Sequence, residues 1–203
     1  MVNASSPASA SAGGLAVATP EGRWRTRDII VAAVIGVAFG VVFWAWGLAW
    51  PAFEPLNGIV PVARDLFYAV WLVPAVLAPL IVRKPGAALF AEMVAAGVSA
   101  LIGSQWGVDT LLSGFVQGAA AELVFAFAFY RSYAFPVLAI AAVASAAAAW
   151  IHDWVLYYAQ VSLEIQLARG IVMAISAVVI VAGGSMLLER SLRRAGVLEG
   201  FPG

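Results

Sequence analysis

Two carboxylates, Glu92 and Glu122, stand inside apolar stretches of this sequence, where an ionised side chain needs a physical justification. The stretch "GFVQGAAAELVFAFAFYRSY", residues 114–133, carries Gln117 and Glu122 in its middle. A charge at the centre of a bilayer costs about 3 kcal/mol on insertion scales. A carboxylate in such a place can accept a hydrogen bond from a ligand, or balance a positive ligand charge where water screens little.

Helical spacing indicates the surroundings of Glu122. Gly114, Gly118 and Glu122 recur every four residues and share one helix face, which allows a ligand or another helix to approach closely. Gln117 lies on the flank of this face. We expect Glu122 to form the polar floor of a ligand pocket and Gln117 to add a second directional contact. The alternative is that Glu122 is protonated or hydrogen-bonded and only fixes packing.

Glu92 has a similar setting on a neighbouring apolar segment. It shares a small and polar helix face with Ser99 and Gly103. At about 1.5 Å of rise per residue, Glu92 and Glu122 lie at similar depth and can face each other. A packing role is also open for Glu92, because basic residues at the segment ends could reach toward it: Arg83, Lys84 and Arg131.

Aromatic residues gather at one end of the apolar segments, in excess of what an interfacial belt at both membrane faces requires. Flat or cationic ligands are bound by such rings through stacking and cation–π attraction. His152, beside Asp153, is either a polar cap or part of the site. The candidate ligand-binding residues are therefore Glu122, Gln117, Glu92, Trp106, Trp46, Trp71, His152, Trp154 and Tyr157.

Composition identifies the class of protein that must position these residues. Of 203 residues, 64% are hydrophobic and 11% charged, and the mean hydropathy is +0.97. Soluble domains have about 25% charged residues, so this is an integral membrane protein. The net charge of zero gives no indication of a nucleic-acid partner, and the absence of cysteine excludes disulfides and thiolate metal sites. A single histidine predicts no metal site, and no cofactor is expected.

Six apolar segments predict an all-α bundle of six transmembrane helices, at about residues 29–46, 62–82, 86–103, 110–130, 135–157 and 163–188. Nine of the eleven basic residues then fall on one side, which the positive-inside rule makes cytoplasmic, with both termini. Residues 1–22 are expected to be a disordered tail, 23–190 the membrane domain and 191–203 a cytoplasmic tail. The connection over residues 50–65, with three prolines, is expected to fold over the outer mouth as a lid.

Sequence motifs of catalysis are missing. Lys84 is the only lysine and "IVRKPG" is no phosphate-binding loop, so ATP hydrolysis is expected in separate subunits. Ser113 lacks the G-x-S-x-G context of a serine hydrolase, and one histidine cannot form the H-E-x-x-H motif. The chain is not expected to be an enzyme. An autonomous proton-coupled carrier or channel that uses Glu92 and Glu122 as a relay remains the alternative to a binding subunit.

Small residues also form a stripe on the first segment. Ala32, Gly36 and Gly40 share one face, which in lipid is a surface where another helix can dock. The sequence leaves open whether this stripe packs inside the protein or against a partner.

Four stretches resemble the YkoE family: "RDIIVAAVIGVAFGVVFWAW", "RKPGAALFAEMVAA", "IGSQWGV" and "SGFVQGAAAELVFAFAFYR". The resemblance covers roughly residues 24–190. Members are substrate-binding S components of energy-coupling factor (ECF) transporters for thiamine or its hydroxymethylpyrimidine precursor. The resemblance implies a six-helix S-component fold in the prokaryotic plasma membrane, a ligand site toward the outer side, and two kinds of partner, a transmembrane coupling protein and two ABC-type ATPases. It also implies that Ala32, Gly36 and Gly40 pack on the coupling protein.

Overall fold

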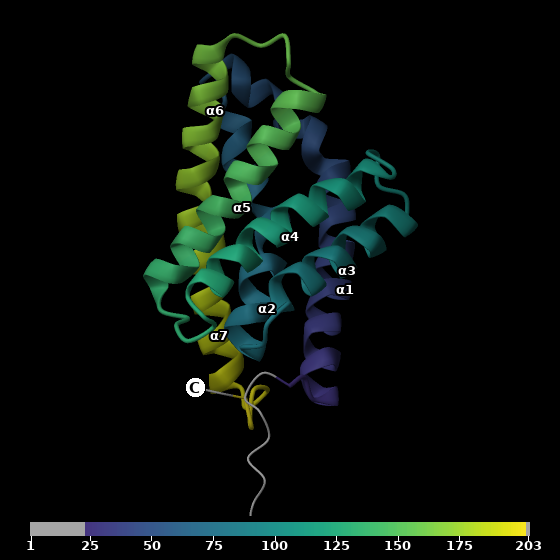
Figure 1. Ribbon diagram of the computed structural model, residues 1–203. Helices are drawn as coiled ribbons and strands as arrows, with labels where there is room; N and C mark the ends of the chain where they lie inside the picture. Colours follow the sequence, from purple (N-terminus) through teal and green to yellow (C-terminus); the bar gives the residue numbers. More distant parts are fainter. Residues whose placement is uncertain (1–22, 202–203) are drawn as a thin grey trace, which may run out of the picture.

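The computed structural model describes residues 23–201, and the expected disordered tail 1–22 lies outside them. The described chain is helical (Figure 1). Its elements are α1 (Thr26–Ala49), η1 (Trp50–Gly58), η2 (Ala63–Leu72), α2 (Pro74–Val82), α3 (Ala87–Leu101), α4 (Asp109–Phe127), α5 (Phe135–Leu156), α6 (Leu163–Ser176), η3 (Ala177–Gly183) and α7 (Gly184–Arg194).

These elements form six membrane-crossing segments, as predicted, because η2 continues into α2 and α6 continues through η3 into α7. Within residues 23–201, five segments are long and apolar enough to cross a membrane. The third segment, α3, has only 15 residues and is about 22 Å long. The start of α1 and the end of α7 lie at the same end of the bundle (Figure 1).

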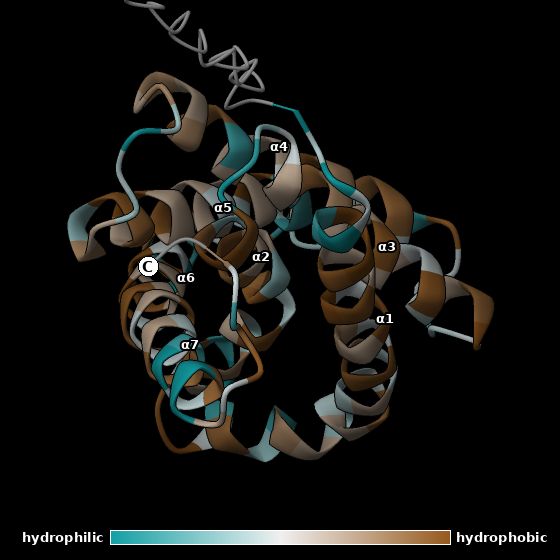
Figure 2. Ribbon diagram, turned by 90° about the horizontal axis from the view of Figure 1, so that it is seen from below, coloured by the Kyte–Doolittle hydropathy of each residue, from teal (hydrophilic) through white to brown (hydrophobic). Residues whose placement is uncertain are grey.

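Helix α2 lies at the centre of the bundle, with α1, α3, α4, α5 and the α6–α7 segment around it (Figure 2). Most residues in the apolar stretch of the η2–α2 segment are buried inside the protein, whereas few are buried in the stretch over Thr26–Gly58, which contains α1. The outer helices therefore present apolar side chains away from the protein, as expected for surfaces in lipid.

The small-residue stripe of α1 packs against α3. Ala32, Gly36 and Gly40 are all buried, and a Cβ added to Gly36 would lie 2.7 Å from the Cβ of Val94. In lipid there is no hydrophobic driving force between helices. Small residues stabilise the contact because they let two helices approach closely and form tight van der Waals packing. The expectation that the stripe docks on the coupling protein is therefore corrected, and the internal-packing alternative holds, because α3 already covers it.

The second segment is interrupted in the middle of the bundle. Its first half, η2, is a 3₁₀ helix, and Pro74 begins the α-helical second half. Proline lacks an N–H and fits the first turn of a helix, where backbone donors have no helical partner. The interruption leaves the N-terminus of α2 pointing into the protein, where its donors need acceptors from elsewhere.

The C-terminal residues are packed on the bundle. Helix α7 extends to Arg194, and Leu198 is 4% exposed within an apolar cluster that includes Leu77, Ile81 and Ala32. Arg27 of α1 lies over the ring of Phe201 at 5.1 Å. The described part of the segment expected to be a tail after residue 190 therefore continues the helical domain.

Packing of α1 on α3 predicts that Gly40→Val destabilises the protein. A Cβ at Gly40 would lie 2.5 Å from the Cβ of Val98 and 2.8 Å from the carbonyl oxygen of Ala95, which cannot move without shifting α3. Overpacking of this kind costs about 1–3 kcal/mol. We expect a lower midpoint of thermal unfolding in detergent.

The matched control is Gly97→Val on α3, where an added Cβ meets nothing within 4 Å. It should unfold at nearly the parent's temperature. If Gly40→Val left stability unchanged and only abolished co-purification with a partner protein, the stripe would be a docking surface after all.

Candidate ligand-binding site

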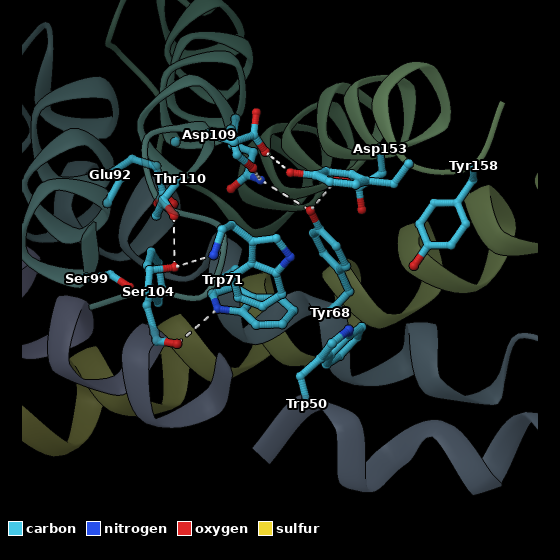
Figure 3. Close-up of a pocket in the computed structure, with 17 residues that line it drawn as sticks. Trp50, Tyr68, Trp71, Glu92, Ser99, Ser104, Asp109, Thr110, Asp153 and Tyr158 are labelled. Atoms are coloured by element: carbon cyan, nitrogen blue, oxygen red, sulfur yellow. Dashed lines mark hydrogen bonds between the residues drawn. The ribbon is translucent and has the colours of Figure 1, made fainter. Parts of the chain in front are cut away.

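A cavity of about 260 Å³ lies between α1, η1, η2, α3, α4 and α5 (Figure 3). The end of α5, which supplies part of its wall, lies at the end of the bundle opposite the described chain ends (Figure 1). Small-molecule sites usually measure about 300–1,000 Å³, so this cavity lies just below that range. Its wall comprises Phe43, Trp50, Tyr68, Trp71, Glu92, Ala96, Ser99, Ser104, Trp106, Asp109, Thr110, Ser113, Gly114, Gln117, Asp153, Tyr157 and Tyr158.

Trp71 is the centre of an aromatic cluster in this wall. Its ring centroid lies 4.7 Å from that of Trp50, 5.2 Å from Tyr68 and 5.3 Å from Trp106, all in edge-to-face arrangements. These rings come from η1, η2 and the α3–α4 connection. Edge-to-face contacts hold each ring in one orientation, so the cavity has a rigid aromatic surface.

The charged side chains of the wall are all carboxylates: Glu92, Asp109 and Asp153. Among the lining residues, all within the described part of the chain, none is lysine, arginine or histidine. Figure 3 shows Glu92 and Ser99 on one side of Trp71, and Asp153 and Tyr158 on the other. The site is therefore acidic and aromatic at once.

Glu92 is fully buried and supplies an acceptor for the backbone donors at the start of α2. Its Oε2 accepts a hydrogen bond from the backbone N–H of Ala75 at 3.0 Å. Its Oε1 is buried without a hydrogen-bond partner, although the side chain lines the cavity. A buried acceptor left unpaired costs about 1–3 kcal/mol, which a ligand donor at this point would recover.

Gln117 is held in the wall by a short chain of polar contacts. Its Nε2 donates to Ser113 Oγ at 2.6 Å and lies 3.5 Å from the hydroxyl of Tyr68. The Tyr68 hydroxyl in turn donates to Asp153 at 3.3 Å. The glycine face predicted on α4 serves packing here, since Cβ atoms at Gly114 and Gly118 would meet Ala96 and Glu92 of α3.

An ion pair behind the cavity joins α6 to η2. The guanidinium of Arg169 donates to both carboxylate oxygens of Asp65 at 3.2–3.3 Å, and both side chains are buried. The same guanidinium lies 3.7 Å from the ring centroid of Tyr158 and 4.0 Å from Asp153. Arg169 thereby positions two lining residues without lining the cavity itself.

The connection with three prolines lies beside the cavity, and its role as a lid stays a prediction. It folds as the 3₁₀ helix η1 and contributes Trp50 to the wall. Arg64 pairs with Glu54 of η1, donates to the hydroxyl of Tyr158 at 3.0 Å and lies over the ring of Trp50 at 4.9 Å. Arg64 and its chain neighbour Asp65 each form an ion pair with a more distant residue, Glu54 and Arg169 respectively.

Glu122 is not in the cavity wall, which corrects the expectation that it forms the pocket floor. Its oxygens accept hydrogen bonds from the backbone N–H groups of Gly86, Ala88 and Leu89 at 2.6, 2.9 and 3.4 Å, and from the Tyr130 hydroxyl at 2.8 Å. These N–H groups begin α3, so Glu122 caps that helix from α4. Burial raises the pKa of Tyr130, and the hydrogen bond to Glu122 raises it further, which keeps this phenol a donor.

Three further candidates lie outside the wall. Trp46 donates from its indole to the carbonyl of Phe67 at 3.0 Å, and Trp154 packs on Trp150 at 5.1 Å between centroids. His152 lies behind the wall, between Asp109 and Asp153. These residues lie at the end of the bundle where the cavity is, but helix rotation directs them away from it.

Of the nine candidates, the structure brings five together in the wall: Glu92, Gln117, Trp71, Trp106 and Tyr157. Sequence reasoning missed Tyr68, Asp109 and Asp153 as lining residues. Asp109 and Asp153 are acidic and near segment ends, where solvated charges are common, so their types carried no signal. Tyr68 could have been found, since it lies three residues before Trp71 on the same face of a helix.

Comparison with known proteins gives three matches. A family model described as "ABC-type cobalt transport system, permease component" matches residues 27–148. The "Putative HMP/thiamine permease protein YkoE" of Bacillus subtilis (strain 168) is 33% identical over 179 residues, which cover 88% of this chain and 89% of that protein. A structure titled "Crystal structure of an S-component of ECF transporter" matches with a TM-score of 0.80 at 33% identity, over 88% of this chain and 90% of the other.

Capping of α3 by Glu122 predicts a structural phenotype for its variants. Glu122→Leu leaves three backbone donors and the Tyr130 hydroxyl without an acceptor, at about 1–3 kcal/mol for each buried group. We expect a large fall in unfolding temperature, and an intermediate fall for Glu122→Gln, which keeps one acceptor oxygen.

The ligand affinity of the folded fraction shows whether Glu122 only caps α3 or also contacts the ligand. It should stay within about twofold of the parent for Glu122→Gln, measured by calorimetry after size-exclusion chromatography. A stable Glu122→Gln protein with strongly reduced affinity would contradict the capping assignment.

Proposed function

We propose that this chain, which belongs to the YkoE family of S components of ECF transporters, binds thiamine or its hydroxymethylpyrimidine precursor in the cavity around Trp71. The ligand enters from outside the cell, and the loaded protein delivers it together with a transmembrane coupling protein and two ABC-type ATPases. The observation that carries the proposal is a cavity wall that combines rigid aromatic rings with three carboxylates and no cationic side chain.

Thiamine fits this wall by charge. Its thiazolium ring is a permanent cation, and a cation gains both from ring faces and from nearby carboxylates. Asp109 and Asp153 lie close together, because both contact the ring of His152, and the Tyr157 hydroxyl donates to Asp109. Figure 3 shows Asp153 and Tyr158 on the same side of Trp71. We assign the thiazolium to this side of the cavity.

The aminopyrimidine ring fits the opposite side. Its exocyclic amino group is a hydrogen-bond donor, and the unpartnered Oε1 of Glu92 is a buried acceptor at the cavity wall. Ser99 and Gln117 also line the cavity and offer further hydrogen-bond donors and acceptors. The hydroxymethylpyrimidine precursor shares this ring and lacks the cation, so it would occupy the Glu92 side alone.

The basic residues support the proposed orientation. Arg23, Arg25, Arg27 and the three arginines after residue 189 belong to the end of the bundle where both described chain ends lie. Placing this end in the cytoplasm satisfies the positive-inside rule and turns the cavity outward. The N- and C-termini are then cytoplasmic, and the protein is a multi-pass component of the plasma membrane.

A proton relay through Glu92 and Glu122, the basis of the carrier alternative, has no support in this geometry. Glu122 uses both oxygens to cap α3, and Glu92 caps Ala75 at the start of α2. Purified protein reconstituted alone in liposomes tests the point. Uptake driven by a pH gradient without ATPase subunits would contradict the proposed role as a binding subunit.

Glu92→Gln is the variant that tests the pyrimidine contact. A glutamine can keep its carbonyl on the N–H of Ala75, but it turns an amide donor toward the cavity in place of an acceptor. We expect affinity for both thiamine and hydroxymethylpyrimidine to fall by about 1–3 kcal/mol, roughly 5- to 160-fold in Kd. Calorimetry with both ligands measures it.

Equal losses for the two ligands indicate that Glu92 contacts the ring they share. A loss confined to thiamine would move the cation to Glu92 and overturn the assignment of the two sides. Unchanged affinity for both would remove Glu92 from the site.

Trp106→Ala should weaken thiamine binding by about 1–3 kcal/mol, the usual contribution of one stacked ring. Trp154→Ala is its matched control, because Trp154 is at the same end of the bundle but packs on Trp150 outside the cavity. Quenching of tryptophan fluorescence by thiamine measures both affinities. Equal effects of the two substitutions would show that Trp106 contributes only to general packing.

Ligand identity is tested by mass spectrometry of small molecules released from the purified, denatured protein. We expect thiamine or hydroxymethylpyrimidine in amounts comparable to the protein. Reproducible co-purification of an unrelated compound, with no binding of either expected ligand, would overturn the proposed function.

A further inference from the structure

The histidine of this chain is held between two acidic residues of the cavity wall. Its Nε2 lies 3.1 Å from Oδ1 of Asp109, and its Nδ1 lies 3.1 Å from Oδ1 of Asp153. The His152 side chain is 6% exposed and does not line the cavity, whereas both carboxylates do. We propose that His152 is a positioning residue that holds Asp109 and Asp153 as an imidazolium, so that its proton and a cationic ligand compete for the same two carboxylates.

Counting protons shows which form of the ring this geometry requires. A neutral imidazole has one N–H and can donate to only one of the two carboxylates, and its other nitrogen would then turn a lone pair toward a carboxylate oxygen. The imidazolium has two N–H groups and satisfies both contacts. Two acceptors at equal distance on opposite sides of the ring therefore match the charged form.

The groups around the ring leave an uncompensated negative charge. Asp109, from the start of α4, also accepts a hydrogen bond from the Tyr157 hydroxyl. Asp153, on the same helix as His152, accepts one from Tyr68 of η2.

The remaining charges nearby belong to Arg169 of α6, which lies 4.0 Å from Asp153, and to its partner Asp65 of η2. Three carboxylates thus face one guanidinium and one imidazole. The cluster carries one net negative charge when His152 is protonated and two when it is neutral.

This charge balance gives His152 an influence on ligand choice, an inference that rests on the proposed function. A bound thiazolium beside Asp109 and Asp153 disfavours the imidazolium, and by reciprocity the proton on His152 disfavours the thiazolium. A neutral hydroxymethylpyrimidine has no such conflict. Loss of the proton from His152 therefore favours the cationic ligand over the neutral one.

Nuclear magnetic resonance of the ligand-free protein tests the protonation state of His152 directly, because the sequence contains one histidine. Full-length protein labelled with ¹⁵N-histidine and purified through a histidine-free tag gives a single pair of ring signals. We expect both ring nitrogens to be protonated at pH 7. Asp109→Asn, which removes one charge but keeps the shape, should move the titration of the ring about one to three pH units lower.

A singly protonated ring at pH 7 in the parent would overturn the proposal, as would a titration that Asp109→Asn leaves unchanged. Both outcomes are independent of ligand binding. Failure of thiamine and hydroxymethylpyrimidine to bind at any pH would therefore count against the proposed function, and the ring signals would still decide the state of His152.

Calorimetry from pH 6 to 8.5 then tests the competition, with the ionisation of each free ligand measured separately. Thiamine affinity should rise with pH, by at most about tenfold per unit for one released proton, and hydroxymethylpyrimidine affinity should stay within twofold. His152→Gln should abolish the rise, whereas Tyr157→Phe, which removes a donor to Asp109 that stays protonated in this range, should retain it. A rise that persists in His152→Gln would overturn the competition.

Discussion

The buried ion pair of Arg169 and Asp65 is the interaction on which the half of the protein that contains the cavity depends. An unpaired charge at this depth costs several kcal/mol in a bilayer, so neither side chain can move without the other. The pair joins the last membrane segment to the second one, which is otherwise weakened by its 3₁₀ geometry. Its value lies in fixing one arrangement of these segments more than in net stability, because desolvation of both charges offsets much of their attraction.

The cavity follows from this arrangement. The ring of Tyr158 packs on the guanidinium of Arg169. The Tyr158 hydroxyl also accepts a hydrogen bond from Arg64. Asp153 lies next to the same guanidinium and holds Tyr68, whose ring packs on Trp71. One ion pair thus orients residues of η1, η2, α5 and α6 around a common space. A ligand that binds there meets side chains that are already in place, which reduces the entropy lost on binding.

A second constraint is that every backbone donor inside a membrane needs an acceptor. Two helices have a glutamate of a neighbouring helix at their start: Glu92 for α2, which begins inside the bundle, and Glu122 for α3, which begins after the α2–α3 connection. Glu122 spends both oxygens on backbone and tyrosine donors. Glu92 spends one and leaves the other at the cavity wall. Both glutamates accept hydrogen bonds at a helix start. Only Glu92 keeps an oxygen without a hydrogen-bond partner, so only Glu92 is available to a ligand.

The sequence by itself determined the class, the six segments with their limits to within a few residues, and the end of the bundle where aromatic residues gather and the cavity lies. These properties depend on hydropathy and on the distribution of charge and tryptophan, which are additive along the chain. Only the tertiary structure showed that Glu92 and Trp106 line the cavity while Glu122 and Trp154 do not, because this depends on how each helix is rotated about its axis and on how the α3–α4 connection folds. That rotation is set by contacts between distant residues, such as Gly40 with Val98 and Arg169 with Asp65, which no local pattern encodes.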